Sequence, residues 1–310
     1  MKIITLTLNP AFDLHCQMDS FKPGHENLAD ITALEAGGKG VNISRALVTA
    51  GVENLALVVL GEENGDSFRR ALTADGMVHL AISVPGRIRE NITLHSSNAP
   101  ETRISFRGFG ADAALLAAVE NALSPEVDGD TVLTFTGSLP KGIDAEMSVE
   151  FLRRMKGRGA RIVIDSRSFT LSHIAAVRPW LIKPNEEEIA MYTDAAVTDL
   201  DSAARAAVDL RASCAENVMI SLGGAGAVLA AEDGACYAAC APKIEVRSTI
   251  GAGDSSIAGF IAAAGEGCPH ADRLARAICF GSAACMTEGT RPPVLSDIET
   301  LAAQVSVCRL

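Results

Sequence analysis

From residue 111 onward, the sequence alternates between segments typical of strands and segments typical of helices. Short aliphatic runs at 131–136, 161–165 and 217–222 are separated by longer amphipathic stretches. Strands joined by helices lie parallel and are covered on both faces, so the alternation predicts an α/β fold with a mostly parallel central sheet. In such folds ligands bind beyond the carboxyl ends of the strands, which directs attention to the loops that follow them.

The remaining elements are placed by the same periodicities. Earlier in the chain we expect a strand at 3–8, a helix from Gly40 to Gly51, a buried strand at 55–60 and a helix at 67–74. Later we expect helices at 112–124, 145–157, 185–191, 201–214, 253–265 and 270–287, a short strand at 180–183 and a strand pair near 226–247. Residues 166–179 are expected to form a loop.

Two stretches near the N-terminus fit a different pattern. Residues 11–35 contain a turn at Pro23-Gly24, and residues 88–107 contain one at 98–100. Together they predict a small antiparallel β unit attached to the main sheet. No internal repeat divides the chain, so we expect one domain over 1–310 with these two segments as an appendage.

Composition narrows the function classes. The chain has 310 residues, and its net charge of −11 disfavours nucleic acid and anionic membranes as partners. The apolar start is short and broken by threonines, and no window suits a spanning helix. The eight cysteines form no CxxC pair, which favours reduced thiols and a cytoplasmic location.

The strongest motif for chemistry is TIGAGDSSIAGF at 249–260. Its glycines stand just before a predicted helix, where free backbone N–H groups and the helix dipole form an anion hole suited to a transferring phosphoryl group. Asp254 within the motif has two interpretations. It is either an N-cap that stabilises the helix by about 1 kcal/mol, or a base that accepts a proton from an attacking hydroxyl.

A second glycine-rich segment, AGGKGVN at 36–42, precedes another predicted helix. Glycines allow a ligand to approach the backbone, Lys39 offers a charge to phosphate, and Asn42 can bind hydroxyls. The alternative is a flexible turn with a solvated lysine. Neither the Walker A pattern nor GxGxxG occurs in the chain, which disfavours P-loop and Rossmann sites.

The segment LIKPNEEE at 181–188 joins a short strand to a helix. Asn185 and Glu188 lie three residues apart on one helix face, where an amide and a carboxylate suit hydrated Mg²⁺. The alternative is an acidic first turn that complements the helix dipole.

Weaker signals occur at two further strand ends and in the small β unit. SLGGAG at 221–226 allows close approach of a flat or phosphorylated ligand, or is a plain glycine turn, and TGSLP follows the strand at 131–136. Asp13 could orient sugar hydroxyls, with a turn-forming Asp as the alternative. Arg89 and Arg103 could clamp an anionic substrate, or be solvated surface residues.

Together these motifs resemble the ribokinase-like sugar kinases, in particular the phosphofructokinase-B branch, which includes 1-phosphofructokinase, tagatose-6-phosphate kinase and the minor 6-phosphofructokinase. The resemblance extends over nearly the whole chain. It rests on TLNPAFD at 7–13, GGKGVN at 37–42, GSLP at 137–140, KPN at 183–185, SLG at 221–223 and IGAGDS at 250–255. It implies a three-layer fold in which the small β unit is a lid, and a homodimer formed through that lid.

The resemblance also implies roles for the matched residues. Asp254 would be the base, and Gly251, Ala252 and Gly253 would form the anion hole. Asp13, Gly38 and Asn42 would hold the sugar, and the substrate's own phosphate would be bound by Lys39, Arg89, Arg103 and Ser138. ATP would be bound by Lys183, Asn185, Ser221, Gly223 and Gly226, and Asn185 and Glu188 would contact Mg²⁺ through water.

The implied reaction is transfer of the ATP γ-phosphoryl group to a ketohexose monophosphate, with fructose 1-phosphate as the first candidate. Fructose 6-phosphate and tagatose 6-phosphate are the next candidates. Arg103 stands in TRIS at 102–105, where the 1-phosphofructokinases and tagatose-6-phosphate kinases usually read TEIN and the minor 6-phosphofructokinase carries an arginine. A second departure is Arg167 in IDSRS at 164–168. A kinase of an unphosphorylated sugar or nucleoside is disfavoured by Lys39, Arg89 and Arg103, and a non-catalytic sensor by Asp254.

Overall fold

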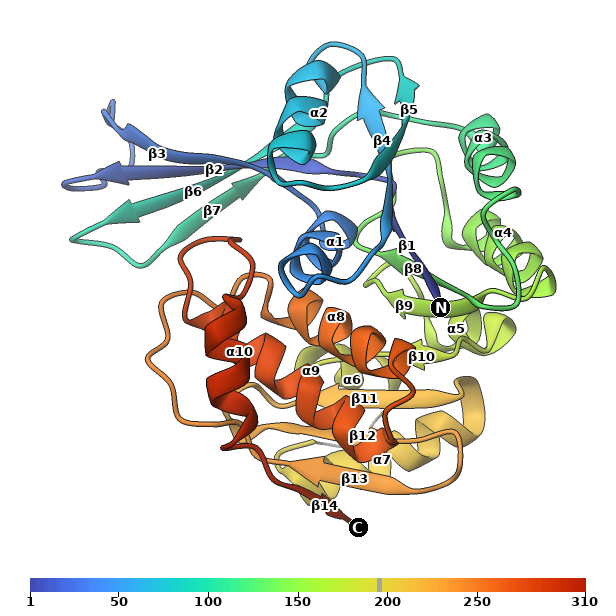
Figure 1. Cartoon of the computed structure of the whole chain (residues 1–310). Coiled ribbons are helices and arrows are strands. Elements are labelled where there is room, and N and C mark those ends of the chain that lie inside the picture. The colour runs from blue at the N-terminus through green and yellow to red at the C-terminus, as the bar shows by residue number, and fades with distance from the viewer. Residues whose placement is uncertain (194–196) are drawn as a thin grey trace.

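The computed structural model describes residues 1–193 and 197–310 and contains a large sheet flanked by helices, with a smaller sheet projecting from one edge (Figure 1). Within the described residues the large sheet has ten strands. In spatial order they are β14 (Val307–Arg309), β13 (Cys236–Ala239), β12 (Ala227–Ala230), β11 (Asn217–Ser221), β10 (Leu181–Ile182), β9 (Arg161–Asp165), β8 (Thr131–Thr136), β1 (Lys2–Thr7), β4 (Leu55–Gly61) and β5 (His79–Val84).

Within this sheet, β5, β4, β1, β8, β9, β10 and β11 are parallel to one another, whereas β12, β13 and β14 each run antiparallel to the strand before them. The predicted α/β fold with a mostly parallel sheet is therefore confirmed. The carboxyl ends of β1, β8, β9 and β10 meet at one edge, and this shared edge is what brings distant loops together.

The helices cover both faces of the large sheet. They are α1 (Lys39–Thr49), α2 (Gly65–Ala74), α3 (Ala113–Leu123), α4 (Ala145–Gly157), α5 (Leu171–Val177), α6 (Glu186–Tyr192), α7 (Leu200–Cys214), α8 (Ala252–Gly265), α9 (His270–Cys285) and α10 (Leu295–Ala302), with a 3-10 turn η1 (Gly223–Ala225). None of the helices described is long and apolar enough to cross a membrane.

Two hydrophobic cores follow from the two-residue period of the strands. In β8, Val132 belongs to the same buried cluster as Ile257 and Phe260 of α8, while Leu133 belongs to the cluster on the other face, which contains Phe151 of α4. Each buried strand therefore contributes to both cores, as expected for aliphatic runs without polar alternation.

The predicted loop at 166–179 is wrong in part, because α5 lies within it. This helix begins at a capping box formed by Thr170 and His173 and buries only Ile174 and Val177, so its apolar pattern is too short to recognise. The strands β5 and β14 and the helix α10 were also not predicted. The strand pair expected near 226–247 is shorter than predicted, since β13 ends at Ala239.

The small sheet consists of β3 (Asp30–Gly37), β2 (Ala11–Met18), β6 (Arg89–Ser96) and β7 (Thr102–Ser105), in that order. The prediction of a purely antiparallel unit is wrong, because β2 and β6 are parallel. The reason is topological: β2 follows β1 and β6 follows β5, so both leave the carboxyl edge of the large sheet in the same direction.

The two faces of the small sheet differ in character. One row across its four strands consists of Leu34, Leu14, Ile92 and Ile104. The neighbouring rows, on the opposite face, contain Asp13 and Asn91 in one and Arg103 in the other. The sheet thus has an apolar face and a polar face.

Candidate active site

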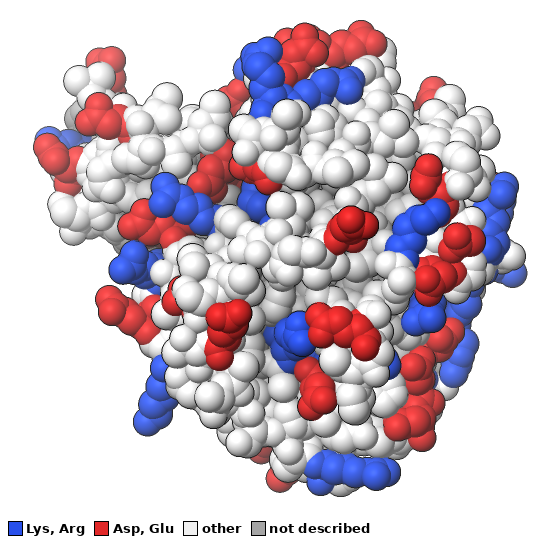
Figure 2. Space-filling view, in the orientation of Figure 1, with Lys and Arg blue, Asp and Glu red and all other residues white. Residues whose placement is uncertain are grey.

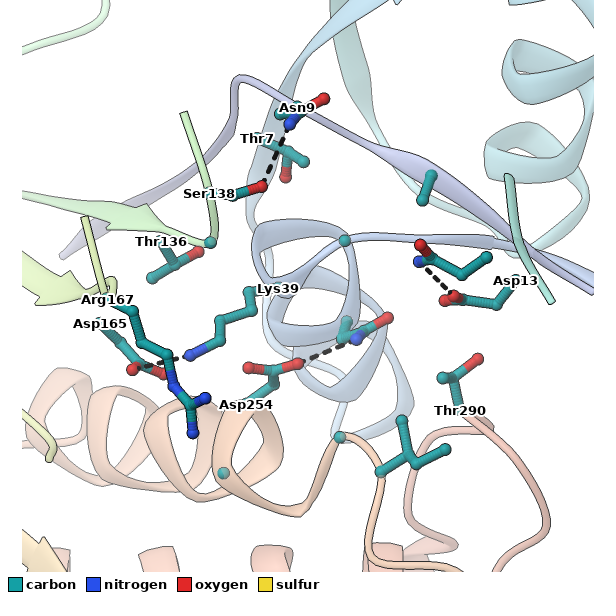
Figure 3. Close-up of a pocket in the computed structure, with 18 of the residues that line it drawn as sticks. Thr7, Asn9, Asp13, Lys39, Thr136, Ser138, Asp165, Arg167, Asp254 and Thr290 are labelled. Carbon is teal, nitrogen blue, oxygen red and sulfur yellow. Dashed lines mark hydrogen bonds and ion pairs between the residues drawn. The ribbon is translucent and has the colours of Figure 1, made fainter. Parts of the chain in front are cut away.

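A cavity of about 680 Å³ lies between the polar face of the small sheet and the carboxyl edge of the large sheet (Figure 3). The N-termini of α1 and α8 also border it. Every residue predicted to bind the substrate lines this cavity: Asp13, Gly38, Lys39, Asn42, Arg89, Arg103 and Ser138. Asp254, Gly251, Gly253 and Glu188 line it as well.

The start of α8 decides between the two interpretations of Asp254. The N-cap is Gly251, whose φ of 79° lies in the left-handed region, and Asp254 is the third helical residue. Among residues 1–193 and 197–310 no side chain caps this helix, so the capping interpretation is wrong. Among the described residues, no hydrogen-bond partner is found for the N–H groups of Gly253 and Asp254, which remain available to an anion.

The carboxylate of Asp254 is buried and faces the cavity. Its Oδ2 accepts a hydrogen bond of 2.9 Å from Nδ2 of Asn42. Burial raises the pKa of Asp254 to about 6, with a further upward contribution from Asp165, while Lys39 and the Asn42 hydrogen bond act against the rise. A carboxyl group that ionises near neutral pH suits a general base.

Lys39 lies beside Asp254, and its ammonium is 2.9 Å from Oδ1 of Asp165. Lys183 approaches the other oxygen of Asp165 at 3.9 Å. Burial alone would lower the pKa of Lys39, but the carboxylates of Asp165 and Asp254 raise it above its usual value. Burial would likewise raise the pKa of Asp165, yet Lys183 and Lys39 hold it below its usual value. Lys39 and Asp165 are therefore both charged.

Asp13 is held at the other end of the cavity. Its Oδ1 accepts hydrogen bonds from Asn91 at 2.8 Å and from Arg103 at 3.0 Å. A Cβ added at Gly37 would lie 2.1 Å from Oδ2 of Asp13, so only glycine leaves room for this carboxylate.

Arg89 is a cavity cation with only long hydrogen bonds. It donates to the carbonyl of Asn9 at 3.3 Å and to Ser138 Oγ at 3.5 Å, and within the described chain it forms no ion pair. Burial lowers the pKa of its guanidinium; Asp13 opposes this effect and Arg103 adds to it. A partly desolvated cation without a carboxylate partner is suited to an anionic ligand.

Several buried polar atoms of the cavity wall lack a hydrogen-bond partner among the described residues. They are Thr7 Oγ1, Asn9 Oδ1, Arg89 Nε, Asn91 Oδ1, Thr136 Oγ1 and Asp165 Oδ2. Unsatisfied buried polar atoms are uncommon in native proteins. Their concentration here fits a ligand rich in hydroxyl groups and phosphate oxygens.

A second cavity, of about 470 Å³, adjoins the first. It is lined by the predicted nucleotide residues Lys183, Asn185, Ser221, Gly223 and Gly226, by Ala252, and by the apolar side chains of Ile244, Val246 and Ile278. Lys183, Asn185, Thr249 and Gly253 line both cavities, so the N-terminus of α8 lies where the two meet.

The glycines of this second cavity serve different purposes. A Cβ at Gly226 would lie 2.0 Å from the carbonyl oxygen of Ala239, so the hairpin itself requires glycine there. A Cβ at Gly223 or Gly224 would meet no described atom within 4 Å. Those two positions therefore leave space above the backbone, which a flat ring could occupy.

Asn185 and Glu188 form a reciprocal capping box at the start of α6. Oε2 of Glu188 accepts from the N–H of Asn185 at 3.2 Å, and Oε1 accepts from Nε of Arg167 at 3.1 Å. The two side chains thus have a structural function as well as a place on the cavity wall. Within the residues described, no cluster of three His, Cys, Asp or Glu side chains could hold a metal directly.

Some cavity residues were not predicted as site residues. Thr7, Thr136 and Asp165 are the last residues of β1, β8 and β9, so the rule that ligands bind beyond strand ends could have identified them. Arg167 was noted only as a departure from a motif. Thr290 comes from the loop before α10 and gives no signal in the sequence.

The surface differs from the cavity in its charge pattern. On the face shown in Figure 2, acidic and basic side chains are interspersed. The cations of the cavity, by contrast, come together from the N-terminus of α1, the small sheet and the loop after β10. Such a local concentration of positive charge can bind an anion in spite of the net charge of −11.

Comparisons with known proteins agree with this geometry. The sequence pattern described as pfkB family carbohydrate kinase matches residues 8–297. The 1-phosphofructokinase of Rhodobacter capsulatus is 33% identical, over 99% of this chain and 98% of the relative. The 1-phosphofructokinase of Escherichia coli K12 is 32% identical, over 89% of each protein.

The fold has a similar counterpart among solved structures. Phosphofructokinase-2 from Escherichia coli, solved in complex with substrates and products, superposes with a TM-score of 0.90 at 26% identity, covering 98% of this chain and 99% of that one.

Proposed function

Because the chain belongs to the pfkB family of carbohydrate kinases, we propose that it transfers the γ-phosphoryl group of ATP to fructose 1-phosphate, forming fructose 1,6-bisphosphate. It is a phosphotransferase that acts on a sugar hydroxyl, and its curated relatives are fructose phosphate kinases. The observation that carries the proposal is Asp254, a buried carboxylate beside the unpaired N–H groups of α8 and facing a cavity with several cations.

Asp254 is proposed as the general base. Oδ2 is occupied by the hydrogen bond from Asn42, whereas Oδ1 has no partner in the described chain, so Oδ1 is the oxygen placed to accept the hydroxyl proton. The N–H groups of Gly253 and Asp254, together with Gly251 and Ala252, would bind the oxygens of the phosphoryl group during transfer. The raised pKa makes Asp254 basic enough to accept the proton while leaving it ionised at neutral pH.

The substrate would lie with its sugar against Asp13, Gly38 and Asn42. Arg89, Arg103 and Ser138 lie near one another at the small sheet and are proposed to bind the phosphate already present on the sugar. Lys39 was expected to share that function. Its ion pair with Asp165 beside Asp254 supports a different one, so we propose that Lys39 neutralises the group being transferred.

The nucleotide is proposed to occupy the second cavity. Lys183 and Asn185 stand where its phosphates would enter the first cavity, and Ser221, Gly223 and Gly226 line the remainder. Ile244, Val246 and Ile278 offer an apolar surface to a purine ring.

Magnesium fits this site as an ion held mainly by water and phosphate oxygens. Glu188 supplies a carboxylate and Asn185 an amide at the junction of the cavities, which is the limited oxygen donor set that Mg²⁺ accepts in phosphoryl-transfer enzymes. Bound there, the ion would neutralise charge on the phosphates. Arg167, which donates to Glu188, would keep that carboxylate in place.

The small sheet is proposed to be a lid and also the interface of a homodimer. Its polar face covers the substrate cavity, so closure would exclude water from the reaction. Its apolar face is exposed: Ile31, Leu34 and Ile104 are 67%, 59% and 44% accessible. The same face of a second copy of the protein would cover it, because such an interface is self-complementary and sheets pack well face to face.

Fructose 6-phosphate is the second candidate substrate. The favouring observation is Arg103, which reaches Asp13 from β7 and adds a cation where the resemblance to 1-phosphofructokinases predicts a glutamate. Phosphofructokinase-2 from Escherichia coli, 25% identical, has been solved with fructose 6-phosphate.

The test is an assay coupled to ADP release, with Mg-ATP and a panel of fructose 1-phosphate, fructose 6-phosphate, tagatose 6-phosphate, fructose, ribose and adenosine. Asp254→Asn is the matched control for contaminating kinases. Turnover of one phosphoketose that disappears in the control supports the proposal. Turnover only of an unphosphorylated compound refutes the phosphate sites, and ATP binding without turnover supports a sensor instead.

A further inference from the structure

Arg45 is a buried cation that the proposed reaction does not use. It belongs to α1, does not line the substrate cavity, and has only a small exposed fraction. Its guanidinium is fixed by two strong contacts: Nε donates to Asp75 Oδ2 at 2.9 Å, and Nη2 donates to the carbonyl of Ala36 at 2.6 Å. The third contact, from Nη1 to Oδ1 of Asn42 at 3.4 Å, links it to the active site.

The orientation of the Asn42 side chain follows from its two neighbours. A guanidinium has only donors, so the atom of Asn42 that faces Arg45 must be the carbonyl oxygen. An ionised carboxylate has only acceptors, so the atom that faces Asp254 must be the NH₂ group. Arg45 and Asp254 thus require the same orientation, and the amide donates to Asp254 at 2.9 Å.

We propose that Arg45 is a positioning residue for the catalytic base: it holds the Asn42 carboxamide with its NH₂ group toward Asp254 and its carbonyl oxygen away from it. The inference rests on the proposed function, because it assigns Arg45 to the base of that reaction. Arg45 acts through Asn42 and touches neither the substrate nor the transferred group. Arg45 also donates to the carbonyl of Ala36, next to the last residue of β3, and so contacts the end of the small sheet that adjoins α1.

The consequence concerns ionisation of Asp254. The charged groups around this carboxylate are Lys39 at the start of α1, Asp165 at the end of β9 and Lys183 after β10. Without Arg45, the Asn42 amide can rotate and present its oxygen to Asp254. The Asp254 carboxylate then loses a hydrogen-bond donor. Its pKa is expected to rise by about one pH unit, because two or three hydrogen bonds to a carboxylate lower its pKa by about two units.

The test is the titration of the Asp254 carboxyl carbon, followed by NMR in protein labelled at aspartate and assigned with Asp254→Asn. Arg45→Met is expected to raise the midpoint by about one pH unit. Arg70→Met, on the exposed surface of α2, is the matched control and is expected to leave it unchanged. An unchanged midpoint in Arg45→Met overturns the proposal.

A double-mutant cycle separates positioning from a simple effect of charge. In an Asn42→Ala background, Arg45→Met is expected to cause no further shift, because the residue through which it acts is missing. An equal shift in that background shows that Arg45 acts by charge alone and overturns the proposal. Asp75→Asn removes an ion-pair partner of Arg45 and is expected to shift the Asp254 midpoint in the same direction. This variant replaces Arg45→Met if Arg45→Met does not fold. An unchanged midpoint in Asp75→Asn would also overturn the proposal.

Kinetics provides a second measurement. The acid limb of the kcat profile is expected to move with the Asp254 midpoint. The kcat of Arg45→Met is therefore expected to be roughly fivefold lower than that of the wild type at pH 6 and nearly equal to it at pH 8.5. An equal loss at every pH contradicts the proposal. Absence of turnover by the wild-type protein on every phosphoketose refutes the proposed function instead, and the NMR titration still tests Arg45.

Discussion

The ammonium of Lys39 lies 2.9 Å from the carboxylate of Asp165, a residue 126 positions further along the chain. The pair sits at the end of β9, beside Asp254. A lysine in a glycine-rich loop is easily interpreted as a ligand for any phosphate. Its buried partner holds it beside Asp254, where we propose that the phosphoryl group is transferred, and this relationship underlies several of the predictions below.

Replacing Asp254 by Asn is expected to lower kcat by about 10²–10⁴ while leaving the KM values nearly unchanged, because the base is lost and the shape is kept. In the wild type, kcat is expected to rise with pH through about 6, as the carboxyl group loses its proton. Steady-state rates from pH 5 to 8.5 measure both. A profile without an acid limb near pH 6 would contradict the assignment of Asp254 as base.

The same substitution is expected to stabilise the folded protein at pH 7. The folded-state pKa of Asp254 is raised from near 4 to about 6, so its contribution to stability is fully present below pH 4 and is lost as the pH rises through 6. Asn carries no charge to bury, so the free energy of unfolding at pH 7 is expected to increase by about 1–3 kcal/mol. Urea denaturation at pH 7 and pH 4 checks this, with the difference expected to vanish at pH 4.

Replacing Arg89 by Met is expected to raise the KM for the phosphosugar by about tenfold or more, with a smaller effect on kcat, because a charge-assisted contact to phosphate is lost. The matched control is Arg87→Met, whose arginine pairs with Glu90 on the surface. Kinetics with varied sugar phosphate provides the measurement. Equal KM values in the two variants would show that Arg89 does not bind the substrate.

Replacing Asp165 by Asn is expected to destabilise the protein by about 3–5 kcal/mol, because Lys39 and Lys183 are then left together without their carboxylate. Inorganic phosphate is expected to raise the melting temperature of the variant more than that of the wild type, since an anion can replace the missing charge. Thermal denaturation with and without phosphate measures the difference. An equal rise in both proteins would argue against a shared anion site.

Replacing Leu34 by Lys is expected to convert the proposed dimer into a monomer, because a charge is placed within the apolar face of the small sheet. Val208→Lys is the control, since Val208 is an exposed apolar residue of α7, a helix that flanks the large sheet. Analytical ultracentrifugation of the two variants and the wild type decides. A wild-type protein that is monomeric at micromolar concentration refutes the interface.

Much of the fold could be predicted from the sequence because the relevant patterns are local. The strands at 131–136 and 161–165 and the helix at 145–157 have the predicted bounds, since aliphatic runs and an amphipathic period suffice to define them. The helix α5 and the strands β5 and β14 escaped prediction. Each is short or lies at a sheet edge, where packing against neighbours outweighs local preference.

The sequence by itself also determined which segments contain the candidate site, since every predicted residue borders one of the two cavities. Glycines before a helix and polar residues after a strand have consequences that are nearly independent of the rest of the chain.

Only the tertiary structure decided what individual side chains do. Local criteria allow Asp254 to cap α8. In the structure the N-cap is Gly251, and the Asp254 carboxylate accepts a hydrogen bond from Asn42, 212 residues away. Lys39 and Asp165, and Arg45 and Asp75, are likewise paired across separate elements. Hydrogen bonds and ion pairs act over only a few ångströms, so their partners are set by how the elements pack, which no local pattern contains.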